Sequence, residues 1–193
     1  MVNKCFFLFL LAVGISCQGN SQTLADALSK KDSVAALALI KKGADVNAVD
    51  ANATSQLMNA CRWADDWTVS FLLRHGALAD NPKSPKGRTP LMIACAYYSG
   101  KGICNMLIAY GANVNATASD NITPLMLAAQ NAKLDVVELL LKKGANPNVK
   151  DANGKTAYDY ADKSEVSDYL KKSVTDTRLD KQAVMDMLKK AMK

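Results

Sequence analysis

Histidine is nearly absent from this chain, because His75 is the single one among 193 residues. A metal site built on imidazole would need a second histidine, and the chain has no nucleophile elbow, phosphate loop or Cys-x-x-Cys pair. Its carboxylates fall where turns and helix starts are expected, as Asp65, Asp120 and Asp151 do. We therefore expect a protein that is not an enzyme, with no cofactor, no metal site and no small-molecule substrate.

The chain also lacks an apolar run long enough to cross a membrane. The run from Cys5 to Ile15 is too short to span a bilayer as a helix. Lys4 precedes this run and a polar stretch, 16–22, follows it, which is typical of a secretory signal peptide. We expect residues 1–16 to be the signal peptide and residues 17–21 to be a short tether before the folded part.

A continuous basic segment is missing from the body of the chain. The formal net charge is +6, of which Lys4 carries one and the segment from Lys171 to Lys193 carries four. About +1 is left for the segment between them, whereas a nucleic-acid surface needs a basic stripe. We therefore expect no nucleic-acid partner.

What the chain does contain is a repeat. A Gly-Ala step ends an apolar stretch four times, and the successive glycines are 33, 35 and 33 residues apart, namely Gly43, Gly76, Gly111 and Gly144. A segment of this length cannot bury its apolar face alone and is stable only when it stacks on its neighbours. The period therefore predicts a solenoid.

Each repeat is expected to contain two helices. The first begins at a hydroxyl residue that can cap it, in the phrases Ser55 to Met58, Thr89 to Met92 and Thr123 to Met126. The second has apolar residues at helical spacing, then cations and a glycine, which suit a helix C-terminus. One repeat is therefore predicted as helix, turn, helix and stop.

At this point the sequence resembles the ankyrin repeat family, whose Thr-Pro-Leu-His, paired alanines and Gly-Ala-Asp-Val-Asn are nearly matched by residues 123–149. The resemblance implies an all-α ankyrin repeat solenoid over residues 22–173, with short hairpin finger loops. About five repeats are expected, three full and a degenerate first and last, because terminal repeats are atypical. The family also implies a non-enzymatic module that binds other proteins.

Two features depart from the family pattern. Met58, Met92 and Met126 stand where the family has histidine, and they either fill gaps in the core or offer thioethers to a soft metal, of which we favour the first. An extra residue near Ser99 to Gly102 lengthens the turn of the third repeat, and turns of this kind tolerate insertion.

Cys17 follows a small residue at the end of the apolar leader, and this arrangement resembles the lipobox of bacterial lipoproteins. The resemblance implies that Cys17 is acylated and anchors the domain in a membrane. Gly14 departs from the pattern, because a leucine is usual there. Plain secretion after cleavage and an uncleaved anchor are the alternatives. Gln18 after the cysteine favours sorting to an outer membrane, so the expected location is the cell envelope, at the outer membrane or in the periplasm.

Three further cysteines belong to the repeats, namely Cys61, Cys95 and Cys104. Cys61 and Cys95 occupy the same position in adjacent repeats, where stacked helices hold their backbones too far apart to bridge easily. A bridge from Cys95 to Cys104 within one repeat is the alternative to free thiols. An odd count leaves at least one free thiol in either case.

The tail, residues 174–193, is predicted to form an amphipathic helix from about Asp180, with Val184, Leu188 and Ala191 or Met192 on one face. It either caps the last repeat or touches an anionic membrane or a partner groove.

The family resemblance also indicates a binding surface. Positions five and six after the motif leucine face the groove in the family, and here they are Arg62 and Trp63, Ala96 and Tyr97, and Gln130 and Asn131, with Tyr98 next. Tryptophan, tyrosine and arginine dominate binding hot spots. The finger loops add Lys86, Arg88 and Asn115. The alternative for Trp63 is packing against Tyr97 between repeats.

The resulting expectation is an exported protein, tethered in the bacterial cell envelope, that binds an unidentified protein partner, with inhibitor, immunity or protective protein as narrower versions. A structural scaffold of an envelope assembly and a secreted effector that binds a host protein are the alternatives.

Overall fold

The computed structural model describes residues 22–80, 84, 86–97, 99–162 and 174–193, with the side chains of 162 and 174–181 left out of the description. This part of the chain contains ten helices and no strand. The helices are α1 (Leu24–Ser29), α2 (Ser33–Lys41), α3 (Gln56–Arg62), α4 (Asp66–Arg74), α5 (Pro90–Ala96), α6 (Lys101–Ala109), α7 (Pro124–Gln130), α8 (Leu134–Lys142), α9 (Ala157–Asp162) and α10 (Val174–Ala191).

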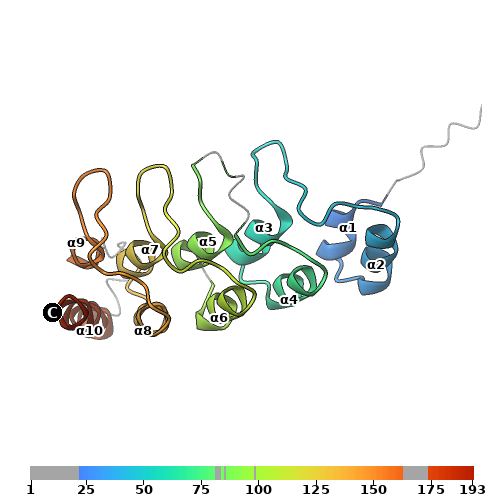
Figure 1. Cartoon of the computed structure of the whole chain (residues 1–193). Coiled ribbons are helices and arrows are strands. Elements are labelled where there is room, and N and C mark those ends of the chain that lie inside the picture. Colours follow the sequence, from blue (N-terminus) through green and yellow to red (C-terminus); the bar gives the residue numbers. More distant parts are fainter. Residues whose placement is uncertain (1–21, 81–83, 85, 98, 163–173) are drawn as a thin grey trace, which may run out of the picture.

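The helices form two parallel rows (Figure 1). The first row holds α1, α3, α5, α7 and α9, and loops project from its side of the slab. The second row holds α2, α4, α6, α8 and α10. Each repeat contributes one helix to each row, which confirms the predicted all-α solenoid.

First-row helices begin as predicted. The hydroxyls of Ser55, Thr89 and Thr123 accept hydrogen bonds from the backbone N–H groups of Met58, Met92 and Met126. In α1, Thr23 and Asp26 cap each other reciprocally, so the first repeat also begins at a hydroxyl residue although it has no Thr-Pro pair.

The second-row helices α2, α4, α6 and α8 end at the Gly-Ala steps. The four glycines have φ between +86° and +96°, a left-handed conformation that favours glycine. The alanine N–H then donates to a carbonyl five residues earlier, for example from Ala77 to Leu72 at 2.9 Å and from Ala145 to Leu140 at 2.9 Å. This bond is that of a Schellman motif, so the repeated dipeptide is a helix stop.

The core lies between the repeats as well as within them. The motif leucines are buried, and so are the three methionines after them. Ala60, Ala94 and Ala128 are also buried, where small side chains let neighbouring first-row helices pack closely. The methionines therefore lie in the packed interior, where their flexible side chains fill space.

Two of the finger loops are held by an aspartate at the same register position. Asp50 accepts hydrogen bonds from the N–H groups of Asn52 and Thr54, and Asp151 accepts from those of Asn153 and Lys155. Neighbouring fingers are also joined through their backbones, since the Ser119 N–H donates to the Lys86 carbonyl and the Ala152 N–H donates to the Asp120 carbonyl. The later fingers therefore form a connected row.

Amide and carboxylate side chains join consecutive repeats below the fingers. Asn47 donates to the Gly76 carbonyl at 3.2 Å and accepts from the Leu78 N–H at 2.8 Å. In the following repeats, the Asp80 carboxylate accepts a hydrogen bond from the Asn113 N–H. Like Asn47, the Asn115 side chain donates to a glycine carbonyl, that of Gly144, and accepts from a backbone N–H two residues later, that of Asn146. These bonds fix the register of one repeat on the next.

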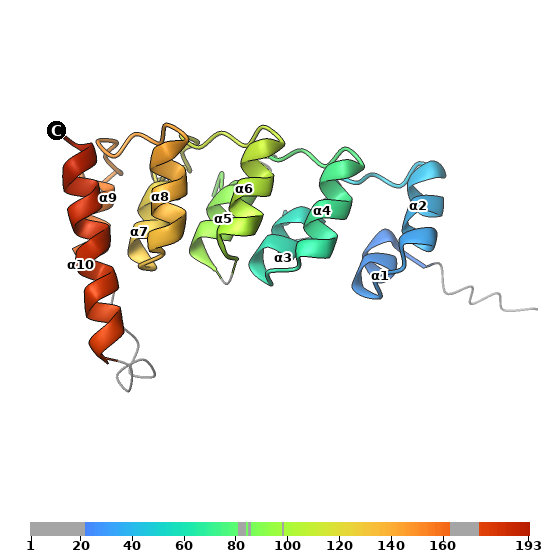
Figure 2. The same ribbon diagram turned by 90° about the horizontal axis from the view of Figure 1, so that it is seen from below.

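The C-terminal helix α10 occupies the second row beside α8 and next to α9 (Figure 2). Val184 and Leu188 are fully buried, whereas Met192 is exposed. Val184 and Leu188 of the expected apolar face therefore point into the stack, whereas Ala191 and Met192 at its end do not. The helix α10 has the place that a cap would take. Among the described residues, no helix is long and apolar enough to cross a membrane.

We predict that Leu188→Ala destabilises the protein by about 2–5 kcal/mol, because it removes a fully buried leucine and leaves a cavity against α8 and α9. Chemical denaturation followed by circular dichroism would measure this change. Met192→Ala is the matched control and should change stability by less than about 0.5 kcal/mol. Equal effects of the two substitutions would contradict a capping role.

Candidate functional site

The predicted binding residues that the structure describes gather at the C-terminal ends of first-row helices. Arg62 and Trp63 end α3, Tyr97 follows α5, and Gln130 and Asn131 end α7. We call these five residues the helix-end surface. Trp63 is 69% exposed and Tyr97 39% exposed, and Gln130 and Asn131 are also exposed. The register of the repeats therefore brings these residues to one edge of the slab.

A cation–π contact joins two repeats on this surface. The Arg62 guanidinium lies 5.0 Å from the centre of the Tyr97 ring. Its Nε atom is buried and has no hydrogen-bond partner in the described structure. Trp63 takes no part in the ring contacts found among the described residues, which join Trp67 to Phe71 and Phe71 to His75. The Tyr97 ring is thus held by arginine, and the neighbouring tryptophan faces solvent.

The backbone that carries Tyr97 is clamped by Lys133. The Nζ atom of Lys133 donates to the carbonyls of Ala94 (3.0 Å), Ser99 (2.9 Å) and Tyr97. Carbonyls at a helix C-terminus lack partners within the helix and attract a cation, so the ammonium group satisfies the end of α5. The lengthened turn of the third repeat is therefore fixed by a residue of the fourth.

The same turn is also tied to the second repeat. The buried hydroxyl of Ser99 donates to the carbonyl of Cys61, the residue before Arg62 in α3. Ser99 thus connects the ends of α3 and α5, and Lys133 then connects them to α8. The expectation that this turn merely tolerates an insertion misses these contacts.

Three thiols lie beneath this turn, and Cys61, Cys95 and Cys104 are all free and buried. Burial raises the pKa of Cys61 far above its usual range. A hydrogen bond from the Cys95 thiol to Cys104 raises the pKa of Cys95 and lowers that of Cys104. Burial lowers the pKa of Lys133. These groups belong to the packed interior and do not form an exposed reactive site.

The remaining predicted residues lie elsewhere. Lys86 is exposed in a finger loop, Arg88 is half-buried, and Asn115 uses its amide to join two repeats. Cys17 and Tyr98 lie outside the described residues. Partner binding by Lys86, Arg88 and Asn115 stays a prediction.

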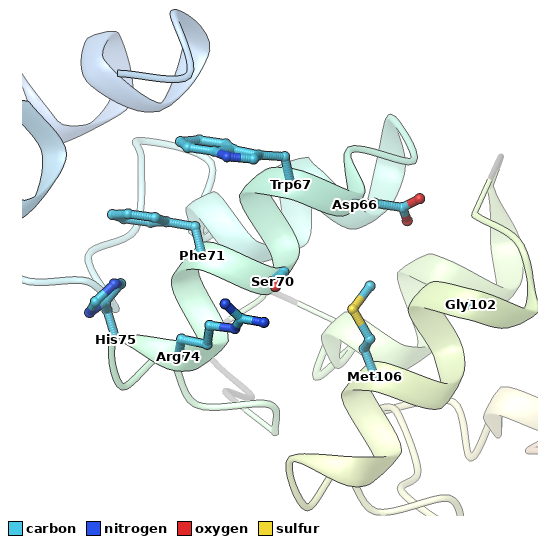
Figure 3. Close-up of a pocket in the computed structure, with 8 residues that line it drawn as sticks. All are labelled: Asp66, Trp67, Ser70, Phe71, Arg74, His75, Gly102 and Met106. Carbon is cyan, nitrogen blue, oxygen red and sulfur yellow. The ribbon is translucent and has the colours of Figure 1, made fainter. Parts of the chain in front are cut away.

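A shallow groove lies on the second row, between α4 and α6 (Figure 3). Trp67, Phe71 and His75 project from one side of α4, with ring centres 5.2 Å and 4.5 Å apart. Arg74 and Met106 lie between the two helices. The spacing of four residues between the rings could have indicated this aromatic row from the sequence.

The described residues contain no group of three or more His, Cys, Asp or Glu side chains that could hold a metal ion. What the helix-end surface offers chemically is aromatic area, one guanidinium and two amides, which suit contact with another protein.

Comparison with known families agrees with this geometry. A model described as ankyrin repeats in three copies matches residues 23–118, and one described as ankyrin repeats in many copies matches residues 107–161. The chain belongs to the ankyrin repeat family. Ankyrin repeats are protein–protein interaction modules, and the family is typically non-enzymatic.

Curated relatives of this ankyrin repeat protein come from distant organisms. Ankyrin repeat protein FPV031 of fowlpox virus is 33% identical over 58% of this chain and 34% of its own length. Ankyrin repeat protein BB_B28 of Borreliella burgdorferi is 33% identical over 55% of this chain and 26% of its own length. Palmitoyltransferase ZDHHC13 of zebrafish is 32% identical over 74% of this chain but only 22% of its own length. The chain thus spans about a third or less of the length of these relatives.

Lys133 is a residue of this ankyrin repeat protein that sequence reasoning missed. Asp32 and Asp65 cap α2 and α4 at the corresponding position, whereas Lys133 begins α8 without a side-chain cap and reaches back to the third repeat. The sequence could have indicated this contact by two features together: an inserted residue in one repeat and a lysine at the capping position of the next.

We predict that Lys133→Met lowers the free energy of unfolding by about 2 kcal/mol, because three carbonyls at the end of α5 lose their donor. Urea unfolding would measure the loss. Lys150→Met, which removes an exposed finger-loop lysine, should stay within about 0.5 kcal/mol of the parent. A loss of the same size in both variants would show that the clamp does not stabilise the turn.

Proposed function

We propose that this ankyrin repeat protein is tethered in a bacterial cell envelope and binds another protein through the helix-end surface. The observation that carries the proposal is the exposed Trp63 beside the Arg62–Tyr97 pair, on a turn fixed by Lys133. Tryptophan, tyrosine and arginine are enriched at protein interfaces relative to the rest of the protein surface. Because the turn is held in place before binding, it loses less conformational entropy when a partner docks.

The narrower role that we favour is that of an inhibitor, immunity or protective protein, in which the rigid surface masks an envelope enzyme or toxin. Trp63 and the Arg62–Tyr97 pair form a compact anchor of the kind that dominates interface energy. A scaffold in an envelope assembly would use the same surface. A secreted effector would also use it, but would carry no lipid.

The binding surface is tested by Trp63→Ala combined with Tyr97→Ala. We expect this variant to lose the partner captured by the parent from a detergent extract of the envelope, with an unchanged circular dichroism spectrum. Tyr110→Ala is the control, since Tyr110 is 50% exposed at the end of a second-row helix. Direct titration of the identified partner should show a loss of at least ~10-fold in affinity for the double variant, because hot-spot residues carry at least 2 kcal/mol. Unchanged affinity would contradict the proposal.

The tether is tested on the mature N-terminus. We expect mass spectrometry of protein from the native membrane to find an acylated N-terminal Cys17, and Cys17→Ser to abolish palmitate labelling and release the protein from the membrane. An unmodified N-terminus just after the leader would favour the secreted effector, and an intact leader would favour an uncleaved anchor.

A further inference from the structure

Positive side chains gather on the edge of the slab opposite the helix-end surface. The two helices of a repeat run in opposite directions, so all second-row helices end on the same edge (Figure 2). Four of those ends carry exposed cations, namely Lys41, Lys42, Arg74, Lys142, Lys143 and Lys190. We call these six residues the basic edge. Its cations come from four helices and lie between residues 41 and 190, so counting charges along the sequence does not reveal it.

None of the six cations of the basic edge forms an ion pair with another described residue. The single ion pair found between described residues joins Lys31 to Asp65, on the opposite side of the repeats. Asp32, Asp65 and Asp135 lie at the N-termini of α2, α4 and α8, on the opposite edge, whereas Glu138 and Asp186 lie within α8 and α10, one turn before Lys142 and Lys190. A helix dipole explains one cation at a C-terminus. It does not require the adjacent pairs at α2 and α8, whose charges repel one another.

Two apolar side chains share this edge with the cations. Tyr110 is 50% exposed at the end of α6, the second-row helix that contributes no cation. Leu78 is 58% exposed just after the Gly76-Ala77 stop of α4. Tyrosine is a favoured residue at a membrane surface, because its ring is apolar and its hydroxyl stays in water. Cations interspersed with an exposed tyrosine and leucine fit a lipid headgroup layer better than a nucleic acid.

We propose that the basic edge lies against an anionic phospholipid surface. Lysine and arginine near such a surface attract it within a Debye length of about 8 Å at physiological salt. Tyr110 and Leu78 reach the boundary between headgroups and acyl chains. The helix-end surface on the opposite edge then faces away from the membrane and stays open to a protein partner. This orientation goes beyond the proposed function and does not depend on acylation of Cys17.

The test uses residues 22–193, which include every contact described above and exclude Cys17, so a lipid anchor cannot contribute. Sedimentation with vesicles of phosphatidylglycerol mixed with phosphatidylcholine should show binding that falls as salt is raised. Vesicles of phosphatidylcholine alone should show little. Failure here would leave the partner surface and Cys17 unaffected, because separate experiments test those.

Charge reversal gives the decisive comparison. Combined Lys41→Glu, Lys42→Glu, Lys142→Glu and Lys143→Glu should weaken binding to the anionic vesicles by at least ~10-fold. The matched control reverses Lys30, Lys86, Lys101 and Lys150, which are exposed away from this edge and change the net charge equally. Circular dichroism would show that both variants are folded.

Three outcomes would overturn the proposal. These are no binding to anionic vesicles, the same loss in the control as in the edge variant, and tighter binding to a random-sequence DNA duplex than to the vesicles. Tyr110→Ala should lower vesicle binding further at high salt, where electrostatic attraction is screened and the contact of the ring remains.

Discussion

Burial of apolar side chains between neighbouring repeats is the contact on which the whole molecule depends. Leu57, Leu91 and Leu125 are each at most 2% exposed, and the burial of each side chain contributes about 1.5–3 kcal/mol to the stability of the fold. First-row helices of six or seven residues would not persist alone in water. Stacking therefore makes the helices stable, and it also fixes where every surface residue lies relative to the same position in the next repeat.

The antiparallel helices within each repeat give the slab two chemically different edges. C-terminal ends of the first row present Trp63 and the Arg62–Tyr97 pair, and those of the second row present the basic edge. Cations are favourable at a helix C-terminus, and the turns that follow lie on the surface. Binding residues at these ends therefore cost little core packing and little stability. Tethering, membrane contact and partner binding, as proposed, would then use different parts of one rigid body.

The turn between the two helices of the third repeat is one residue longer than those of its neighbours, and additional side-chain contacts hold it in place. The backbone of Tyr97 at the end of α5 is extended, whereas Trp63 and Asn131 at the equivalent ends keep ψ near 10°. Ser99 and Lys133 hold this turn from both sides. Because the carbonyls at the end of α5 need donors in a half-buried place, the lysine is a structural partner of the insertion. The aromatic surface therefore depends on a residue that lies in the next repeat and does not belong to that surface.

The sequence by itself determined the period, the helix starts at Ser55, Thr89 and Thr123, the glycine stops and the family, because these follow from backbone chemistry within a few residues. It also placed Trp63 and Tyr97 at equivalent positions. Only the tertiary structure decided that Lys133 reaches Ser99, that α10 joins the second row, and that cations from four helices share one edge. Those contacts join residues separated by 30 to 150 positions, and only the stacking of the repeats brings them together.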